Sequence, residues 1–114
     1  MTRSNNLYVT VEGVSISTPP PTITGTSGCY KIVLGIYVQL SASWSGGLAP
    51  YSWKWVWPDG YTQTGSQSSG TSGTATTSRD FPSGTTAYTS ANFTVFDSLG
   101  RSASTTVKVS GECA

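Results

Sequence analysis

Residues 30–44 of the chain read YKIVLGIYVQLSASW, and this stretch decides the fold class. Every second residue is apolar, in the order Ile32, Leu34, Ile36, Val38, Leu40, Ala42 and Trp44. Alternation of this kind is the period of a β-strand that buries one face. We therefore predict one long strand from Tyr30 to Trp44, running through the centre of a sheet.

Further strand patterns follow this stretch. The run YSWKWVW at 51–57 places its four aromatic residues on one face, and Pro58-Asp59-Gly60 then supplies a turn. Residues 87–96 and 102–109 also alternate, whereas 62–78 are almost entirely small and polar and predict a loop with a weak edge strand at 74–78. No segment has a helical period, so we predict an all-β, immunoglobulin-like antiparallel sandwich of about seven strands.

The first residues form a separate pattern. Leu7, Val9 and Val11 alternate with polar residues, and Gly13 breaks the phase before Pro19-Pro20-Pro21. Three consecutive prolines favour an extended spacer and cannot lie inside a central strand. Residues 1–21 are thus predicted to be an N-terminal edge strand or a docking arm with a proline-rich spacer, and 22–114 the sandwich domain.

Composition excludes several classes of function. The chain has 114 residues, a formal net charge of +1 and 10% charged residues, against about 25% in typical domains. Its six basic residues are scattered, which argues against nucleic-acid binding, and no apolar run approaches the roughly 20 residues of a membrane span. Because the chain has no histidine and few acidic residues, we predict no enzyme activity, cofactor or metal site.

Two segments of the sequence are similar to a known family of domains. The run GLAPYSWKW at 47–55 and the hairpin FTVFDSLGRSASTTVKV at 93–109 resemble polycystic-kidney-disease (PKD)-like and related bacterial immunoglobulin-like domains. The chain departs from that pattern at Lys54, where the family usually has an acidic residue, and in the turn Pro58-Asp59-Gly60. The resemblance implies a spacer, an adhesin or a docking module, on a cell surface, beside a glycosidase or on a phage virion.

The tryptophans can be core residues or a platform for sugar rings. Trp53 and Trp55 lie inside a strand whose aromatic face alternates, and such a face is normally the core face. Trp44 and Trp57 lie at strand ends, where partial exposure is expected. The candidate binding residues are therefore Trp44, Trp57 and Tyr61.

The two cysteines are far apart in sequence. Cys29 precedes the predicted long strand and Cys113 follows the last strand, so the sandwich topology places both at the same pole. A Cys29–Cys113 disulfide is geometrically possible, and two free thiols are the alternative. A disulfide would favour life outside a reducing cytoplasm.

These patterns suggest a non-catalytic structural protein displayed on a surface, such as a capsid decoration or fibre-associated protein of a phage virion. If Met1 is the natural start, the N-terminus lacks the apolar stretch of an export signal. The alternative is a carbohydrate-binding or adhesion module of a secreted or cell-surface protein, and a passive spacer is a third reading. The expected partners are other protein chains of an assembly, including further copies of this chain, or glycans.

Overall fold

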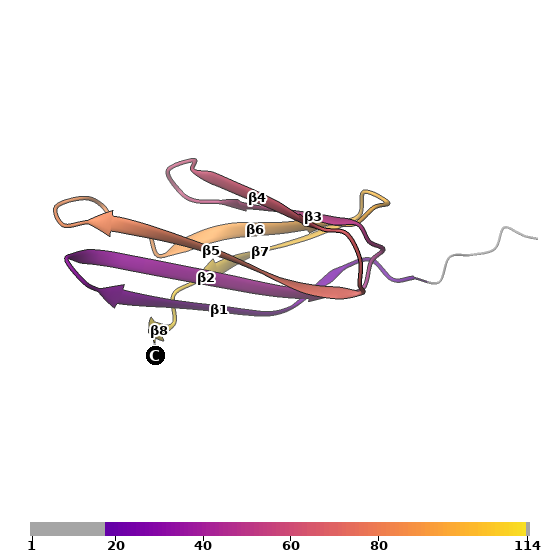
Figure 1. Ribbon diagram of the computed structural model, residues 1–114, viewed down its shortest axis with the longest axis horizontal. Helices are drawn as coiled ribbons and strands as arrows, with labels where there is room; N and C mark the ends of the chain where they lie inside the picture. Colours follow the sequence, from indigo (N-terminus) through magenta and orange to yellow (C-terminus); the bar gives the residue numbers. More distant parts are fainter. Residues whose placement is uncertain (1–17, 114) are drawn as a thin grey trace, which may run out of the picture.

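The computed structural model describes residues 18–113, which form strands and connecting turns without a helix. Two four-stranded sheets face each other, in the orders β5-β2-β1-β8 and β4-β3-β6-β7 (Figure 1). The strand bounds are β1 Thr22–Ile32, β2 Gly35–Ser45, β3 Tyr51–Val56, β4 Thr62–Gln67, β5 Ser72–Pro82, β6 Ser90–Phe96, β7 Ser102–Lys108 and β8 Gly111–Glu112. Every pairing is antiparallel except the short one between β1 and β8. The predicted immunoglobulin-like β-sandwich is confirmed.

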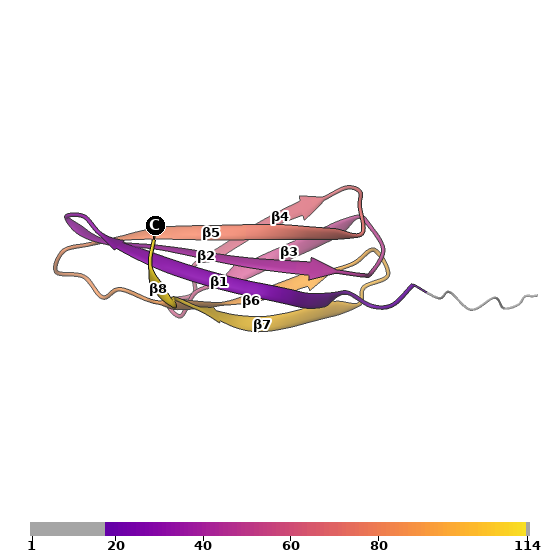
Figure 2. The ribbon, with the colours of Figure 1, turned by 90° about the horizontal axis from the view of Figure 1, so that it is seen from below.

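The sandwich is elongated and its two ends differ. The β1–β2 hairpin and the β5–β6 loop lie together at one end, which we call the tip pole (Figures 1 and 2). The chain enters at the opposite end, the entry pole, beside the β6–β7 turn. There the Thr18 carbonyl accepts a hydrogen bond from Arg101 Nη1 at 3.0 Å, and the Pro19 carbonyl accepts one from the Gly47 backbone N–H at 2.7 Å. Residues 1–17 lie outside the described part of the chain, so the edge strand or docking arm stays a prediction.

The core between the sheets is rich in aromatic rings. Trp44 from one sheet contacts Tyr51, Trp53 and Phe93 from the other, with ring centroids 5.5 to 6.1 Å apart. Aromatic side chains bury large apolar areas, and edge-on or tilted pairs add roughly 0.5–1.5 kcal/mol beyond that burial. The face of β3 predicted to be apolar is indeed turned inward, with Trp55 fully buried and Trp53 half-buried against the core.

The predicted single strand from Tyr30 to Trp44 is wrong. The chain reverses at Val33 and Leu34, so that β1 ends at Ile32, β2 begins at Gly35, and the two pair antiparallel. The even-numbered apolar residues mislead because Ile32 and Leu34 share the parity of the core face, yet Ile32 ends β1, Leu34 lies in the turn, and both are exposed. The glycine at position 35 is the feature of the sequence that indicates a break inside the run. In the structure it adopts a φ of 136°, a conformation that favours glycine.

The predicted loop at 62–78 is wrong for residues 62–67, which form β4. The weak edge strand predicted at 74–78 is confirmed as part of β5, which lies at the edge of its sheet. These strands carry little apolar surface of their own. Instead, the indole of Trp53 covers Gly65 on β4 and that of Trp44 covers Gly73 on β5, so closely that a Cβ at either glycine would clash with the ring. Neighbouring strands therefore supply the apolar surface that these two edge strands lack.

Candidate functional site

The tip of the β1–β2 hairpin is the most exposed apolar feature of residues 18–113. Ile32, Val33 and Leu34 follow one another and are 69%, 70% and 94% exposed. Isolated exposed apolar residues are normal on a protein surface, but three consecutive aliphatic side chains at one projecting end are not. We therefore treat Ile32–Leu34, called the aliphatic tip, as the candidate functional site.

The backbone of the aliphatic tip supports this assignment. Leu34 has φ of 55° and is the one described non-glycine residue in the left-handed region. That conformation costs an L-residue about 1–2 kcal/mol, and tight turns normally use Gly, Asn or Asp for it. Leu34 contributes nothing to the core at 94% exposure, so folding alone does not explain its presence. A strained residue without a structural benefit indicates a function.

The aliphatic tip is braced from one side by the C-terminus. Cys29 of β1 and Cys113 are joined by a disulfide with Cα atoms 4.8 Å apart. The Cys113 backbone N–H donates to the Tyr30 carbonyl at 2.9 Å, and β8 pairs in parallel with β1 at Cys29 and Tyr30. The two cysteines therefore meet at one pole, although Cys29 lies within β1 rather than before a strand. This brace holds the hairpin close to its end.

Two shallow clefts flank the aliphatic tip, with volumes of about 290 and 220 Å³. Both share Gly35, Ile36, Phe81 and Pro82 as lining, one on the side of the β5–β6 loop and the other on the side of Asp80. Phe81 is buried, and its ring lies against the Tyr88 ring in a T-shaped arrangement with the two centroids 5.8 Å apart. The tip pole thus presents a projecting aliphatic knob between hollows with partly apolar walls, a shape suited to a complementary protein surface.

The expected partial exposure of Trp44 and Trp57 is wrong, because both are 1% exposed. Strand ends are often open, but here the adjoining segments close over them. The Trp44 ring packs against Gly73 of β5, and Trp57 is covered by Arg79, whose guanidinium carbon is 5.2 Å from the indole centroid. Trp57 Nε1 also donates to Thr77 Oγ1 at 3.3 Å, and this hydroxyl in turn donates to Gln63 Oε1.

Tyr61 is the predicted binding residue that remains accessible, at 45% exposure. Arg79 brings it next to Trp57, because the guanidinium also lies 4.3 Å from the Tyr61 ring centroid. Asp59 accepts two hydrogen bonds from Arg79, at 3.0 and 2.9 Å, and this pairing lowers the pKa of Asp59 below its ordinary value. The arrangement fastens the β3–β4 turn to β5 of the other sheet and leaves Tyr61 partly exposed to solvent.

Sequence reasoning missed the aliphatic tip because it assigned Ile32 and Leu34 to a buried strand face. Within residues 18–113, no group of three or more His, Cys, Asp or Glu side chains could hold a metal ion. The same residues include no helix long and apolar enough to cross a membrane. Comparisons of the chain with family models, curated proteins and solved structures gave no match.

Proposed function

We propose that this chain is a non-catalytic structural module of a surface assembly that docks onto another protein through the aliphatic tip. The observation that carries the proposal is Leu34, an aliphatic residue 94% exposed in a left-handed backbone conformation. Burying Ile32, Val33 and Leu34 against a partner would remove from water apolar surface that the isolated chain exposes. Full burial of one such side chain is worth roughly 1.5–3 kcal/mol.

The structure around the aliphatic tip suits a docking element. Its hairpin is tied to the rest of the molecule by the disulfide and by β8, so little conformational freedom would be lost on binding. The flanking clefts would accept side chains of the partner, as pockets do around a binding hot spot.

More specifically, we propose a virion component, such as a capsid decoration or fibre-associated protein. The support is compositional: the chain is poor in charged residues and rich in serine and threonine, which suits a dense assembly. The test is mass spectrometry of gradient-purified virions from the source. Stoichiometric presence of the chain is the expected result, and its absence from the particles would overturn the virion assignment.

The docking role of the aliphatic tip needs variants that fold. Leu34→Asn and Val33→Ser remove exposed apolar surface without opening the core, so the thermal unfolding midpoint should not fall. Both should reduce incorporation into assembled particles, whereas Leu99→Asn should not. Leu99 is the matched control, because it is an exposed leucine (51%) in the turn at the entry pole. Equal incorporation of all the variants would contradict docking through the tip.

A second candidate function is glycan binding at Tyr61. Aromatic rings bordered by charged hydrogen-bonding groups recognise sugars, and Tyr61 is exposed beside the Arg79–Asp59 pair. Because Arg79 also covers Trp57, a sugar bound at this surface should change tryptophan fluorescence. Titration with a polysaccharide panel, with Tyr61→Ala as the control, tests this candidate. An unchanged spectrum across the panel would count against it.

A further inference from the structure

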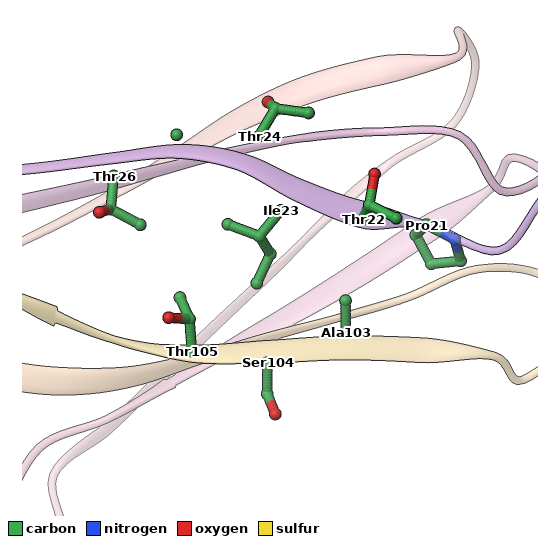
Figure 3. A pocket seen from close by; sticks show the side chains of 9 residues that line it. Pro21, Thr22, Ile23, Thr24, Thr26, Ala103, Ser104 and Thr105 are labelled. Carbon is green, nitrogen blue, oxygen red and sulfur yellow. The ribbon is translucent and has the colours of Figure 1, made fainter.

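The sandwich is open along one side, where β1 and β7 face each other without pairing. A groove of about 520 Å³ runs between them, from Pro21 and Thr22 along the first half of β1. Figure 3 shows Ile23 and Thr26 pointing toward β7, and Ala103 and Thr105 pointing toward β1. Thr26 is exposed although its pairing partner Ala42 is buried, which marks the place where the inner face of β1 loses its cover.

The groove is a wedge that closes toward the tip pole. At its narrow end the Gly28 carbonyl accepts a hydrogen bond from the Ser110 backbone N–H at 2.9 Å. The Lys108 carbonyl lies so close to Gly28 that no side chain would fit between them. The wide end opens at the entry pole, where Pro21 lines the groove.

Both walls of the wedge are free strand edges. One edge of β1 pairs with β2, while β8 covers the other edge only at Cys29 and Tyr30. Among the described residues, β7 has β6 on one side and no strand on its other side. The Gly28 and Tyr30 carbonyls accept hydrogen bonds on the edge of β1 that faces away from β2. Because every second residue of a strand directs its backbone polar groups to the same edge, those of Thr26 also face the groove. Such an edge can accept one more strand.

We propose that this groove binds residues 7–16 of a second copy of the chain as an added β-strand. Leu7, Val9 and Val11 alternate with polar residues, so one face of the strand can cover the open inner face of the sandwich. Gly13 breaks this alternation, and a β-bulge there would return Val14 and Ile16 to the same face. Ten extended residues span about 33 Å, enough to run the length of β7, which has seven residues.

The place where the chain enters favours a second copy over the same molecule. Thr18 and Pro19 are hydrogen-bonded at the entry pole, beside the wide end of the groove. To fill its own groove, the chain would have to reverse sharply just before β1. Pro19, Pro20 and Pro21 oppose that reversal, because each proline fixes its φ and keeps the residue before it extended. A hinge that resists a tight turn promotes exchange of the segment between copies.

The strand directions are compatible with this exchange. Thr22 and Ala103 lie at the wide end, and Gly28 and Lys108 at the narrow end, so β1 and β7 run the same way. A segment that enters from the entry pole of a facing copy would run antiparallel to both. Two copies that meet entry pole to entry pole can exchange segments reciprocally, which gives a closed two-fold dimer. The aliphatic tip would remain free at each outer end.

The oligomeric state of the full chain tests the proposal by light scattering or analytical ultracentrifugation. We expect the wild-type chain to have twice the mass of a monomer. The double variant Val9→Asp/Val11→Asp should be monomeric, as should Ala103→Phe, which fills the groove. The matched controls should stay dimeric. Tyr8→Asp/Thr10→Asp changes the opposite face of the predicted strand, and Thr106→Phe changes an exposed residue of β7 that does not line the groove.

A mixing experiment separates exchange between copies from other self-association. The Val9→Asp/Val11→Asp chain keeps an intact groove, and the Ala103→Phe chain keeps an intact N-terminal segment. Their mixture should form heterodimers through the single remaining segment–groove pair, more weakly than the wild type. A wild-type chain that is monomeric over the accessible concentrations would overturn the proposal, as would dimers insensitive to both disruptive variants. Leu34→Asn should leave the mass unchanged, so this result is independent of docking through the tip.

Discussion

The Asp97 carboxylate holds the Arg101 side chain through Oδ2, which accepts hydrogen bonds from Nε at 3.0 Å and from Nη2 at 2.7 Å. Arg101 Nη1 then donates to the Thr18 carbonyl, so the pair fixes the point at which the chain enters the sandwich. Asp97 also accepts the Leu48 backbone N–H at 3.2 Å, which ties the β2–β3 loop to the β6–β7 turn. One buried carboxylate thus organises the entry pole.

Replacing this carboxylate should be costly. Asp97→Asn keeps the shape of the side chain but removes the charge and one acceptor oxygen from a buried site with several donors. We expect the free energy of unfolding to fall by about 2–3 kcal/mol. Chemical denaturation measures this change, and Asp59→Asn is the control, because its ion pair with Arg79 is solvent-accessible and should matter much less. Equal losses in the two variants would contradict the role given to Asp97.

Acid should destabilise the protein through the same group. Burial alone would raise the pKa of Asp97, but the hydrogen bonds from Arg101 and from the Leu48 backbone outweigh it and lower that pKa. A lowered folded pKa contributes stability above the ordinary value of about 3.9, and this stability is lost as the pH falls through the lower folded value. Unfolding midpoints should therefore be flat from about pH 8 to 5, since the chain has no histidine, and should drop below about pH 4. In Asp97→Asn the drop should be smaller.

Alternation predicted the fold class well, because inward and outward positions on β2, β3 and β6 differ sharply in polarity. It failed at residues whose own polarity does not indicate whether they are exposed or buried. Leu34 continued an apolar series onto a turn, and Gly65 and Gly73 gave no sign that indoles from other strands lie over them. The accessibility of Trp57 could not be predicted either, because it depends on Arg79, a residue from another sheet. Long-range contacts of this kind leave no local pattern.

The strain at Leu34 makes a prediction about stability. Asn tolerates the left-handed region better than Leu, and at 94% exposure the leucine side chain gives no core packing in return. Leu34→Asn should therefore raise the free energy of unfolding by about 0.5–1 kcal/mol in the isolated chain. By contrast, Leu40→Ala in the buried core should lower it by about 2–5 kcal/mol. A clear loss of stability in Leu34→Asn would show that the residue supports the fold after all.

The glycines beneath the indoles should tolerate no side chain. Gly73→Ala would push a methyl group into the Trp44 ring and against the Gln67 side-chain oxygen, so we expect a loss of about 1–3 kcal/mol, as for other overpacked sites. Gly25→Ala is the matched control, since a Cβ at that β1 position meets nothing within 4 Å. It should be neutral or slightly stabilising, because alanine restricts the unfolded chain. Thermal unfolding of both variants decides whether close indole packing holds β5 in place.

The Cys29–Cys113 disulfide should act mainly through the unfolded chain. It joins residues 84 positions apart, and closing a loop of that length removes enough unfolded-state entropy to stabilise the fold by about 4–5 kcal/mol. The Cys29→Ser/Cys113→Ser variant should therefore lose stability on this scale while keeping a native sandwich, seen as unchanged near-UV circular dichroism. A loss far below this value would mean that the unfolded chain is already compact. Amide hydrogen exchange in β1 and β8 of the variant would then show whether the disulfide serves chiefly to hold the hairpin tip against the C-terminal segment.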